Sequence, residues 1–245
     1  MKVSTDALVI REQHTGENDR IVTLLTRDFG LIRAFATGSR KINNRNHAAT
    51  QMLSYGKFVL YKTKDAWRVG EADPIATFFE LRDDIKKLSL AQYFCEVAKV
   101  LTPEEDNSEE YLRLVLNCLQ LTASEKYNQT IIKAVFELYI LSLSGYMPEL
   151  NLCNRCGAQE GEFVLDCAEG VLLCKQHIPV LYERYAPLSQ GALTAMRYIL
   201  SSDLKNAFNF TLSEESLTLL KNTCEIYLKT QTERNFKTLD FYNSL

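Results

Sequence analysis

TDALVIREQHTGENDRIVTLLTRDFGLIRAFAT, residues 5–37, decides how this chain begins to fold. Three short apolar segments, at 5–11, 21–26 and 31–37, are separated by polar turns. In the last segment the apolar residues Ile32, Ala34 and Ala36 alternate with Leu31, Arg33, Phe35 and Thr37, which is the period-2 pattern of a half-buried strand. The segment lengths and the turns between them therefore predict three antiparallel strands at the start of the chain.

Two further strands are expected at 58–61 and 67–70, on either side of the polar turn 62–65. Five short strands leave exposed edges unless the sheet closes, and the OB-fold is a common five-stranded closed solution. We predict an α+β protein in which residues 1–75 form an OB-fold barrel that binds nucleic acid.

Net charge supports a division of this kind. The chain has 245 residues and a net charge of −3, but residues 1–75 hold 12 basic and 8 acidic residues, a local charge of +4. The other residues then carry −7. A basic segment joined to an acidic remainder suggests that the first part faces a polyanion, although a chance fluctuation of this size is the alternative.

The segment between the third and fourth strands, GSRKINNRNH at 38–47, is the first candidate site. Its cations Arg40, Lys41 and Arg45 have no acidic neighbours in the sequence. Arg and Lys can neutralise phosphates, and Gly, Ser and Asn would let the loop adapt to a ligand. A plain solvated loop is the alternative. Four more predicted DNA-binding cations lie on the neighbouring strands: Lys57, Lys62, Lys64 and Arg68.

Aromatic residues on the same strands allow two interpretations. Tyr55, Tyr61 and Trp67 could stack on the bases of single-stranded nucleic acid, beside the cations that hold its backbone. They could equally fill the core of a small barrel, which is the commoner place for such side chains.

From residue 75 onward the apolar residues recur at helical spacing until Pro103 ends the run. Further helices are expected at 111–121, 130–143, 190–202 and 214–231, after an acidic connector at 104–110. Ser189 and Ser213 are predicted N-caps, and Gly145 a C-terminal cap. We therefore expect residues 76–245 to be an all-α domain with an insertion at about 151–180.

That insertion carries the sharpest motif in the chain. Cys153-x2-Cys156 is followed by Cys174-x2-His177, and two such pairs can present three thiolates and one imidazole to a tetrahedral ion. Zinc suits this donor set, whereas an Fe–S cluster is less typical with His, and unconnected cysteines are the remaining alternative.

Four protein ligands fill the shell of a zinc ion, so we predict a structural rather than a catalytic metal. The other four cysteines are Cys95, Cys118, Cys224 and Cys167. The first three lie within helical patterns and are expected to be buried, while Cys167 has no assigned role. No apolar run approaches a membrane span and residues 1–12 lack an export core, so we expect a cytoplasmic protein with reduced cysteines.

Three stretches of the sequence resemble the bacterial RecO family of recombination and repair proteins. They are GENDRIVTLLTRDFGLIRAFATGSRK at 16–41, FELYILSLSGYMPEL at 136–150 and ERNFKTLDF at 233–241, and they occur in the family's order. The sequence departs from the family pattern at His177, where many relatives have Cys, and in the abundance of Asn after Lys41.

The resemblance implies an OB-fold followed by a helical domain with an inserted zinc finger. It also implies binding of single- and double-stranded DNA, annealing of complementary strands, partnership with RecR, and help in loading RecA onto DNA coated by single-strand-binding protein. Such a mediator needs no active site, and we find no phosphate-binding Gly loop or nucleophile elbow in the sequence. The protein is therefore expected not to be an enzyme.

Other function classes stay open at this point. A zinc-stabilised adaptor that binds protein, with only incidental DNA contact, would have the same motifs. A zinc hydrolase would need an open metal position, and a helix-turn-helix regulator would need a basic recognition helix.

Overall fold

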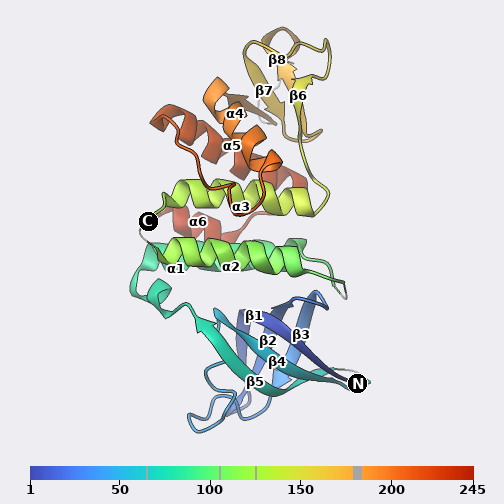
Figure 1. The fold of residues 1–245 in the computed structure, drawn as a ribbon, viewed down its shortest axis with the longest axis vertical. Helices are drawn as coiled ribbons and strands as arrows, with labels where there is room; N and C mark the ends of the chain where they lie inside the picture. The colour runs from blue at the N-terminus through green and yellow to red at the C-terminus, as the bar shows by residue number, and fades with distance from the viewer. Residues whose placement is uncertain (65, 105, 125, 179–183) are drawn as a thin grey trace. The chain divides into compact units, whose positions relative to one another are not determined.

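The computed structural model describes residues 1–64, 66–104, 106–124, 126–178 and 184–245. Two compact units divide the chain: Met1–Ser124 with Phe236–Leu245, and Glu125–Asn235 (Figure 1). The strand-to-helix change predicted at residues 75 and 76 falls inside the first unit, so a domain boundary there stays a prediction. Parts of three predicted segments lie outside the described residues: Asp65 of the turn, Glu105 of the connector and residues 179–180 of the insertion.

The first unit begins with five strands in the predicted positions. They are β1 (Lys2–Thr15), β2 (Asp19–Thr26), β3 (Leu31–Ala36), β4 (Ser54–Lys62) and β5 (Trp67–Thr77). The pairing order β1-β2-β3-β5-β4 closes on itself, because β1 also pairs with β4. A five-stranded sheet of this kind, followed by helices, fits the predicted OB-fold and helical domain.

The narrowest part of the closed sheet is the parallel pairing of β3 with β5. It consists of two residue pairs, Ala34 with Trp67 and Phe35 with Arg68. Along β3 the inward side chains Ile32 and Ala34 are buried in the barrel core, whereas Phe35 is exposed on the outside. The alternation in the sequence thus correctly predicts which side of β3 faces the core.

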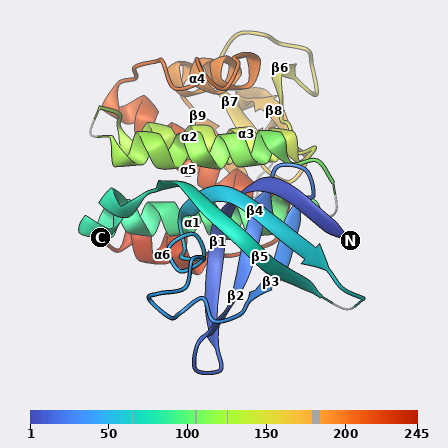
Figure 2. The ribbon, with the colours of Figure 1, turned by 60° about the horizontal axis from the view of Figure 1, so that its bottom comes forward.

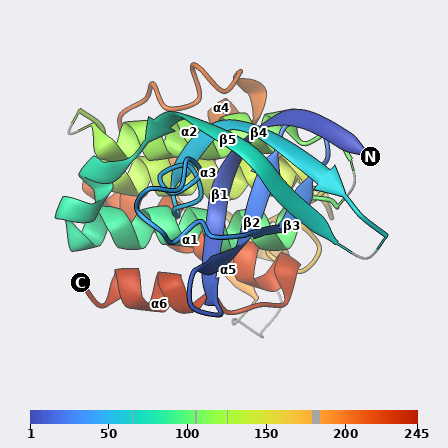
Figure 3. The same cartoon turned by 90° about the horizontal axis from the view of Figure 1, so that it is seen from below.

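The helices of the first unit are a short 3-10 helix (Phe79–Asp83), α1 (Ile85–Leu101), α2 (Glu109–Ala123) and α6 (Lys237–Asn243). The helical run expected from residue 75 begins later, because Ala76 and Pro74 still pair with β4. Asp84 then caps α1 by accepting from the backbone N–H of Lys86 and Lys87. α6 lies along α1, where the backbone N–H and the hydroxyl of Thr238 donate to the carboxylate of Glu96 (Figure 3).

Three helices form the main part of the second unit: α3 (Gln129–Leu143), α4 (Gln190–Ser201) and α5 (Glu214–Thr232). Ser189 accepts from the N–H of Ala192, and Ser213 from that of Ser216, so both predicted N-caps are confirmed. Gly145 follows the end of α3 with a φ of +85°, which confirms the predicted C-terminal cap.

A four-stranded sheet completes the second unit. Its strands, in the order β6-β8-β7-β9, are β6 (Glu149–Cys153), β8 (Val171–Cys174), β7 (Phe163–Asp166) and β9 (Tyr185–Leu188) (Figure 1). The prediction that residues 76–245 are all-α outside the insertion is wrong for β9, which lies beyond residue 180 and pairs with β7. Within the part of the chain that the structure describes, no helix combines the length and the apolar character needed to cross a bilayer.

Candidate nucleic-acid interface and metal centre

The β3–β4 loop, residues 37–53, joins two strands of the barrel (Figure 2), and buried side chains anchor it. Its main anchor is Arg20 on β2, whose side chain is buried. One guanidinium nitrogen, Nη1, lies 2.5 Å from the carbonyl oxygen of Ser39, 3.2 Å from that of His47 and 3.1 Å from the hydroxyl of Thr50. Burial lowers the pKa of Arg20, while Glu12 opposes this shift.

Asn46 forms a second anchor, between the loop and β5. Its amide nitrogen donates to the carbonyl of Gly70, and its amide oxygen accepts from the N–H of Ala72. At the start of the loop, the N–H of Gly38 donates to Asp19. The loop was predicted to be adaptable, but hydrogen bonds fix it to the barrel. Asn46 contributes two of these hydrogen bonds, so its role is structural. We call residues 37–53 the pinned loop.

The loop cations differ in their surroundings. Lys41 is exposed, whereas Arg40 donates to the backbone carbonyl of Glu17 at 2.9 Å. Arg45 lies 3.4 Å from a carboxylate oxygen of Glu71 and 3.7 Å from one of Asp73. Arg45 has no acidic neighbour in the sequence, but it has two in the folded structure, because β5 brings the carboxylates of Glu71 and Asp73 beside it.

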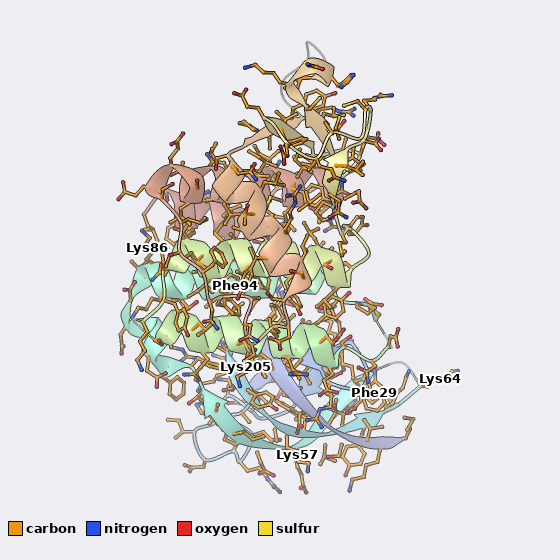
Figure 4. The ribbon with its side chains drawn as sticks, turned by 45° about the horizontal axis from the view of Figure 1, so that its top comes forward. Phe29, Lys57, Lys64, Lys86, Phe94 and Lys205 are labelled. Atoms are coloured by element: carbon orange, nitrogen blue, oxygen red, sulfur yellow. The ribbon has the colours of Figure 1, made fainter. Side chains whose placement is uncertain are left out.

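The four predicted cations on the strands are all exposed, and they divide into two sets. Lys57 is paired across the sheet with Asp6 on β1 and Asp73 on β5, so it has acidic neighbours on both sides. Lys62, Lys64 and Arg68 lie at the other end of the β4–β5 hairpin. Figure 4 shows Lys57 and Lys64 projecting outward at separate places on the barrel.

The aromatic residues likewise divide between core and surface. Trp67 packs against the barrel core and its ring lies beneath the ammonium of Lys62, 5.2 Å from the ring centroid. Tyr61 is 40% exposed, and Tyr55 is half-buried. The core interpretation therefore suits Trp67 and the surface interpretation suits Tyr61.

Sequence reasoning missed part of this surface. A cavity of about 580 Å³ lies beside β3 and β5, and Phe29, Arg33 and Phe35 line it together with Trp67 and Lys62. Phe29 and Trp67 have ring centroids 6.5 Å apart. The signal was present in the alternation of β3, which places Arg33 and Phe35 on the outward side of the strand.

The predicted metal ligands come together in the second unit. The donor atoms of Cys153, Cys156, Cys174 and His177 all lie within 4.8 Å of one another. Cys153 ends β6 and Cys174 ends β8, so the sheet brings the two halves of the motif to one place. These four residues could hold a metal ion.

The distances between the sulfur atoms test whether these four residues fit a metal ion. Sγ of Cys156 lies 3.8 Å from Sγ of Cys174, and Nδ1 of His177 lies 3.2 Å from the same sulfur. In a tetrahedral site with metal–sulfur distances of about 2.3 Å, neighbouring sulfurs lie about 3.8 Å apart. The observed spacing and the soft donor set both fit a tetrahedral ion.

Backbone donors prepare one of these thiols for ligation. Burial alone would raise the pKa of Cys153, but N–H groups of Cys174, Arg155 and Cys156 point at its sulfur and lower the pKa to about 6. The N–H of Cys174 lies 3.3 Å from that sulfur. A metal ligand must be the thiolate, so this environment favours the form that binds metal.

The remaining cysteines are buried. Cys95, Cys118 and Cys224 lie inside helices, which confirms the prediction for all three. Cys167 is also buried, and burial raises its pKa to about 12. Its backbone carbonyl accepts from the side chain of Gln231 on α5, so this residue helps to join the sheet to the helix.

Comparison with known proteins places these features in one family. The family pattern described as "Recombination protein O N terminal" matches residues 1–79, and "Recombination protein O C terminal" matches residues 82–240. A "DNA repair protein RecO" from Acetivibrio thermocellus is 32% identical over 99% of this chain and 97% of its own length.

A second protein with the same name, from Symbiobacterium thermophilum, is 31% identical over 99% of this chain and 97% of its own length. A third, from Alkaliphilus metalliredigens, is 32% identical over 72% of each chain. The two family patterns and these full-length similarities agree with the resemblance carried by the motifs, and the chain belongs to the RecO family of DNA repair proteins.

Proposed function

We propose that this protein is a DNA repair and recombination mediator that works without an active site. It would bind single- and double-stranded DNA through its barrel and anneal complementary strands. With RecR, it would help to load RecA onto DNA coated by single-strand-binding protein. These partners follow from the family and are proposals for this chain.

One observation carries the DNA-binding part of the proposal. Lys62, Lys64 and Arg68 gather at one end of the β4–β5 hairpin, beside an exposed aromatic ring on the same barrel wall. Cations that track a backbone, with aromatic faces between them, are the usual means of holding single strands. The pinned loop adds Lys41 as a further exposed cation, whereas Arg40 acts more in holding the loop.

Arg45 and Lys57, also predicted to bind DNA, are expected to contribute less. Each lies beside carboxylates that offset its charge, so a phosphate would gain less by approaching it. Because β1 and β5 supply those carboxylates, the DNA path is proposed to run toward the hairpin end instead.

Annealing follows from charge neutralisation. Two complementary strands repel each other through their phosphates, and cations that neutralise these phosphates lower the repulsion. Base pairing then supplies all of the sequence specificity, so the protein need not contact base edges. This physical route uses binding surfaces alone.

For the metal centre we propose zinc in a structural role. Cys153, Cys156, Cys174 and His177 would supply four ligands, which fill a tetrahedral shell and leave no position for a substrate. When bound, the ion would supply only cross-linking, by joining the end of β6 to the end of β8. The ligand set is a proposal that the sulfur spacing supports.

An annealing assay tests the proposed function. Two complementary oligonucleotides carrying a fluorescence donor and acceptor are mixed with the full chain at low and at high salt. The proposal predicts faster annealing with protein than without, and loss of the effect at high salt because phosphate contacts are screened. Annealing at the protein-free rate in low salt would contradict it.

A further inference from the structure

Four outward residues form one row across four strands of the barrel. Phe35 on β3 is paired with Arg68 on β5, Arg68 with Tyr61 on β4, and Tyr61 with Lys2 on β1. Directly paired residues point to the same side of a sheet, so ring and cation alternate along this row. We call these four residues the wall row.

Each ring of the wall row is open to solvent. Phe35 is 41% exposed and Tyr61 is 40% exposed, and what sets them apart from single exposed side chains is that they share one row with two cations. Neighbouring strands lie about 4.8 Å apart, so the backbone positions that carry the two rings are separated by roughly 10 Å, with Arg68 on the strand between them. The ammonium of Lys2 lies 5.7 Å from the centroid of Tyr61.

Gly70 has no side chain, and the ring of Tyr61 occupies the space where a side chain would lie. A Cβ atom at Gly70 would lie 2.2 Å from Cε2 of Tyr61, far inside contact distance. The ring therefore lies over the backbone of β5, next to Arg68 on the same strand. The ring is thus held between the backbone of β5 and the ammonium of Lys2, with 40% of the residue exposed.

The wall row continues into the cavity beside β3. Phe35 belongs to the wall row and also lines that cavity, together with Arg33, Lys62 and the ring of Trp67. Two further cations and a further aromatic ring thus adjoin the wall row at this end. One acidic residue, Glu104, lines the cavity as well.

We propose that the wall row is a base-stacking site that makes the barrel prefer single-stranded over double-stranded DNA. Bases would stack on Phe35 and Tyr61, and the phosphate between them would lie against Arg68. In a duplex the bases are already stacked inside the helix, so the rings could contact only single strands. This inference rests on the proposed DNA-binding function, to which it adds strand selectivity.

The test uses the full chain, with Trp67 as the sole tryptophan. Labelled single-stranded oligothymidine and a duplex of equal length are titrated, with anisotropy reporting affinity and Trp67 fluorescence reporting contact near the cavity. Phe35→Leu and Tyr61→Leu are each expected to weaken single-strand binding about tenfold. Duplex affinity should change less than about twofold, because the duplex offers no base face.

Phe79→Leu is the matched control. Phe79 is 45% exposed on the same unit but lies outside the wall row, with its ring against Arg82. Gly70→Ala is a second way to test the role of Tyr61, because it displaces the Tyr61 ring but keeps every functional group of the wall row. It should weaken single-strand binding in the same way as Tyr61→Leu.

Three results would overturn the proposal. In the first, the wall-row variants bind single strands as tightly as the wild type; in the second, they lose single-strand and duplex affinity equally. In the third, the Phe79→Leu control loses as much single-strand affinity as they do. If the wild type binds neither oligonucleotide, the proposed DNA-binding function fails as well, which distinguishes that outcome from the other three.

Discussion

Lys133 is a buried positive charge held between two helices of the second unit. Its ammonium lies 2.7 Å from a carboxylate oxygen of Glu137 on α3 and 2.8 Å from one of Glu225 on α5. Burial alone would lower the pKa of Lys133, but the two carboxylates outweigh it and raise the pKa above 10.5. The cluster thus joins α3 to α5 through charge.

Replacing this cation should destabilise the protein strongly. Lys133→Met leaves the carboxylate of Glu137 buried, and breaking a buried pair in this way costs about 3–5 kcal/mol. The double variant Lys133→Met with Glu137→Leu should recover most of that loss, because the carboxylate that remains, Glu225, is less buried and lies 3.9 Å from the ammonium of Lys221. Urea unfolding followed by circular dichroism measures both, and a single variant as stable as the wild type would refute the account.

The same cluster has a defined pH dependence. Because the folded pKa of Lys133 is raised, its contribution to stability is fully present below pH 10.5 and is lost as the pH rises through the folded value. The stability difference between wild type and Lys133→Met should therefore shrink at high pH. A difference that instead grew as the pH was raised would argue against a charged Lys133.

Arg20 gives a prediction for the pinned loop. Arg20→Lys keeps the charge, but the lysine ammonium ends one bond short of Nη1, the nitrogen that contacts Ser39, His47 and Thr50, and each buried acceptor left unpaired costs about 1–3 kcal/mol. The loop should then open more often and be cut faster by trypsin after Arg40, Lys41 or Arg45. Arg33→Lys, an exposed change on the next strand, is the control, and equal cleavage rates for the two variants would contradict the anchoring role.

At the scale of elements, the proposed metal centre is expected to stabilise the small sheet. Cys156 is the exposed cysteine of the proposed ligand set, so Cys156→Ser removes a donor with little packing cost. The wild type should bind about one zinc per chain, and Cys156→Ser should bind none. Hydrogen exchange should then quicken in β6 and β8 while the barrel stays protected.

Two variants complete this test. His177→Cys should retain zinc, because a fourth thiolate also suits a tetrahedral site, and Cys118→Ala should retain it because Cys118 lies in a helix core. Metal content is read by atomic emission after dialysis. If Cys156→Ser bound as much zinc as the wild type, the proposed ligand set would be wrong.

Elements with a local pattern were predictable, and elements made by distant pairing were not. The alternation in β3 and the capping residues Ser189 and Ser213 were visible in the sequence because their causes lie within a few residues. β9 has four residues and is a strand only because β7 lies beside it. Residues 75–77 likewise continue β5 because β4 provides the partner.

Across the whole chain, the candidate sites follow the same rule: features set by nearby residues could be predicted, and features set by distant strands could not. The spacing of the cysteines was enough to group four ligands, since the motif itself specifies their geometry. For the cations, the sequence shows that several lie in one segment but not what surrounds them, because the carboxylates beside Arg45 come from another strand. The wall row needs the register of four strands at once, which a single sequence does not contain.

The central claim is that the hairpin end of the barrel binds DNA through its phosphates. The most direct test is the salt dependence of single-strand affinity for the wild type and for the Lys62→Ala, Lys64→Ala, Arg68→Ala variant. Arg45→Ala with Lys57→Ala serves as the control that removes cations beside carboxylates.

Each lost phosphate contact changes the slope of log affinity against log salt by about 0.7 for a single strand, so three lost contacts should make it shallower by about 2. The control should change the slope by less than about 0.7. An unchanged slope in the triple variant, or an equal change in the control, would contradict the account.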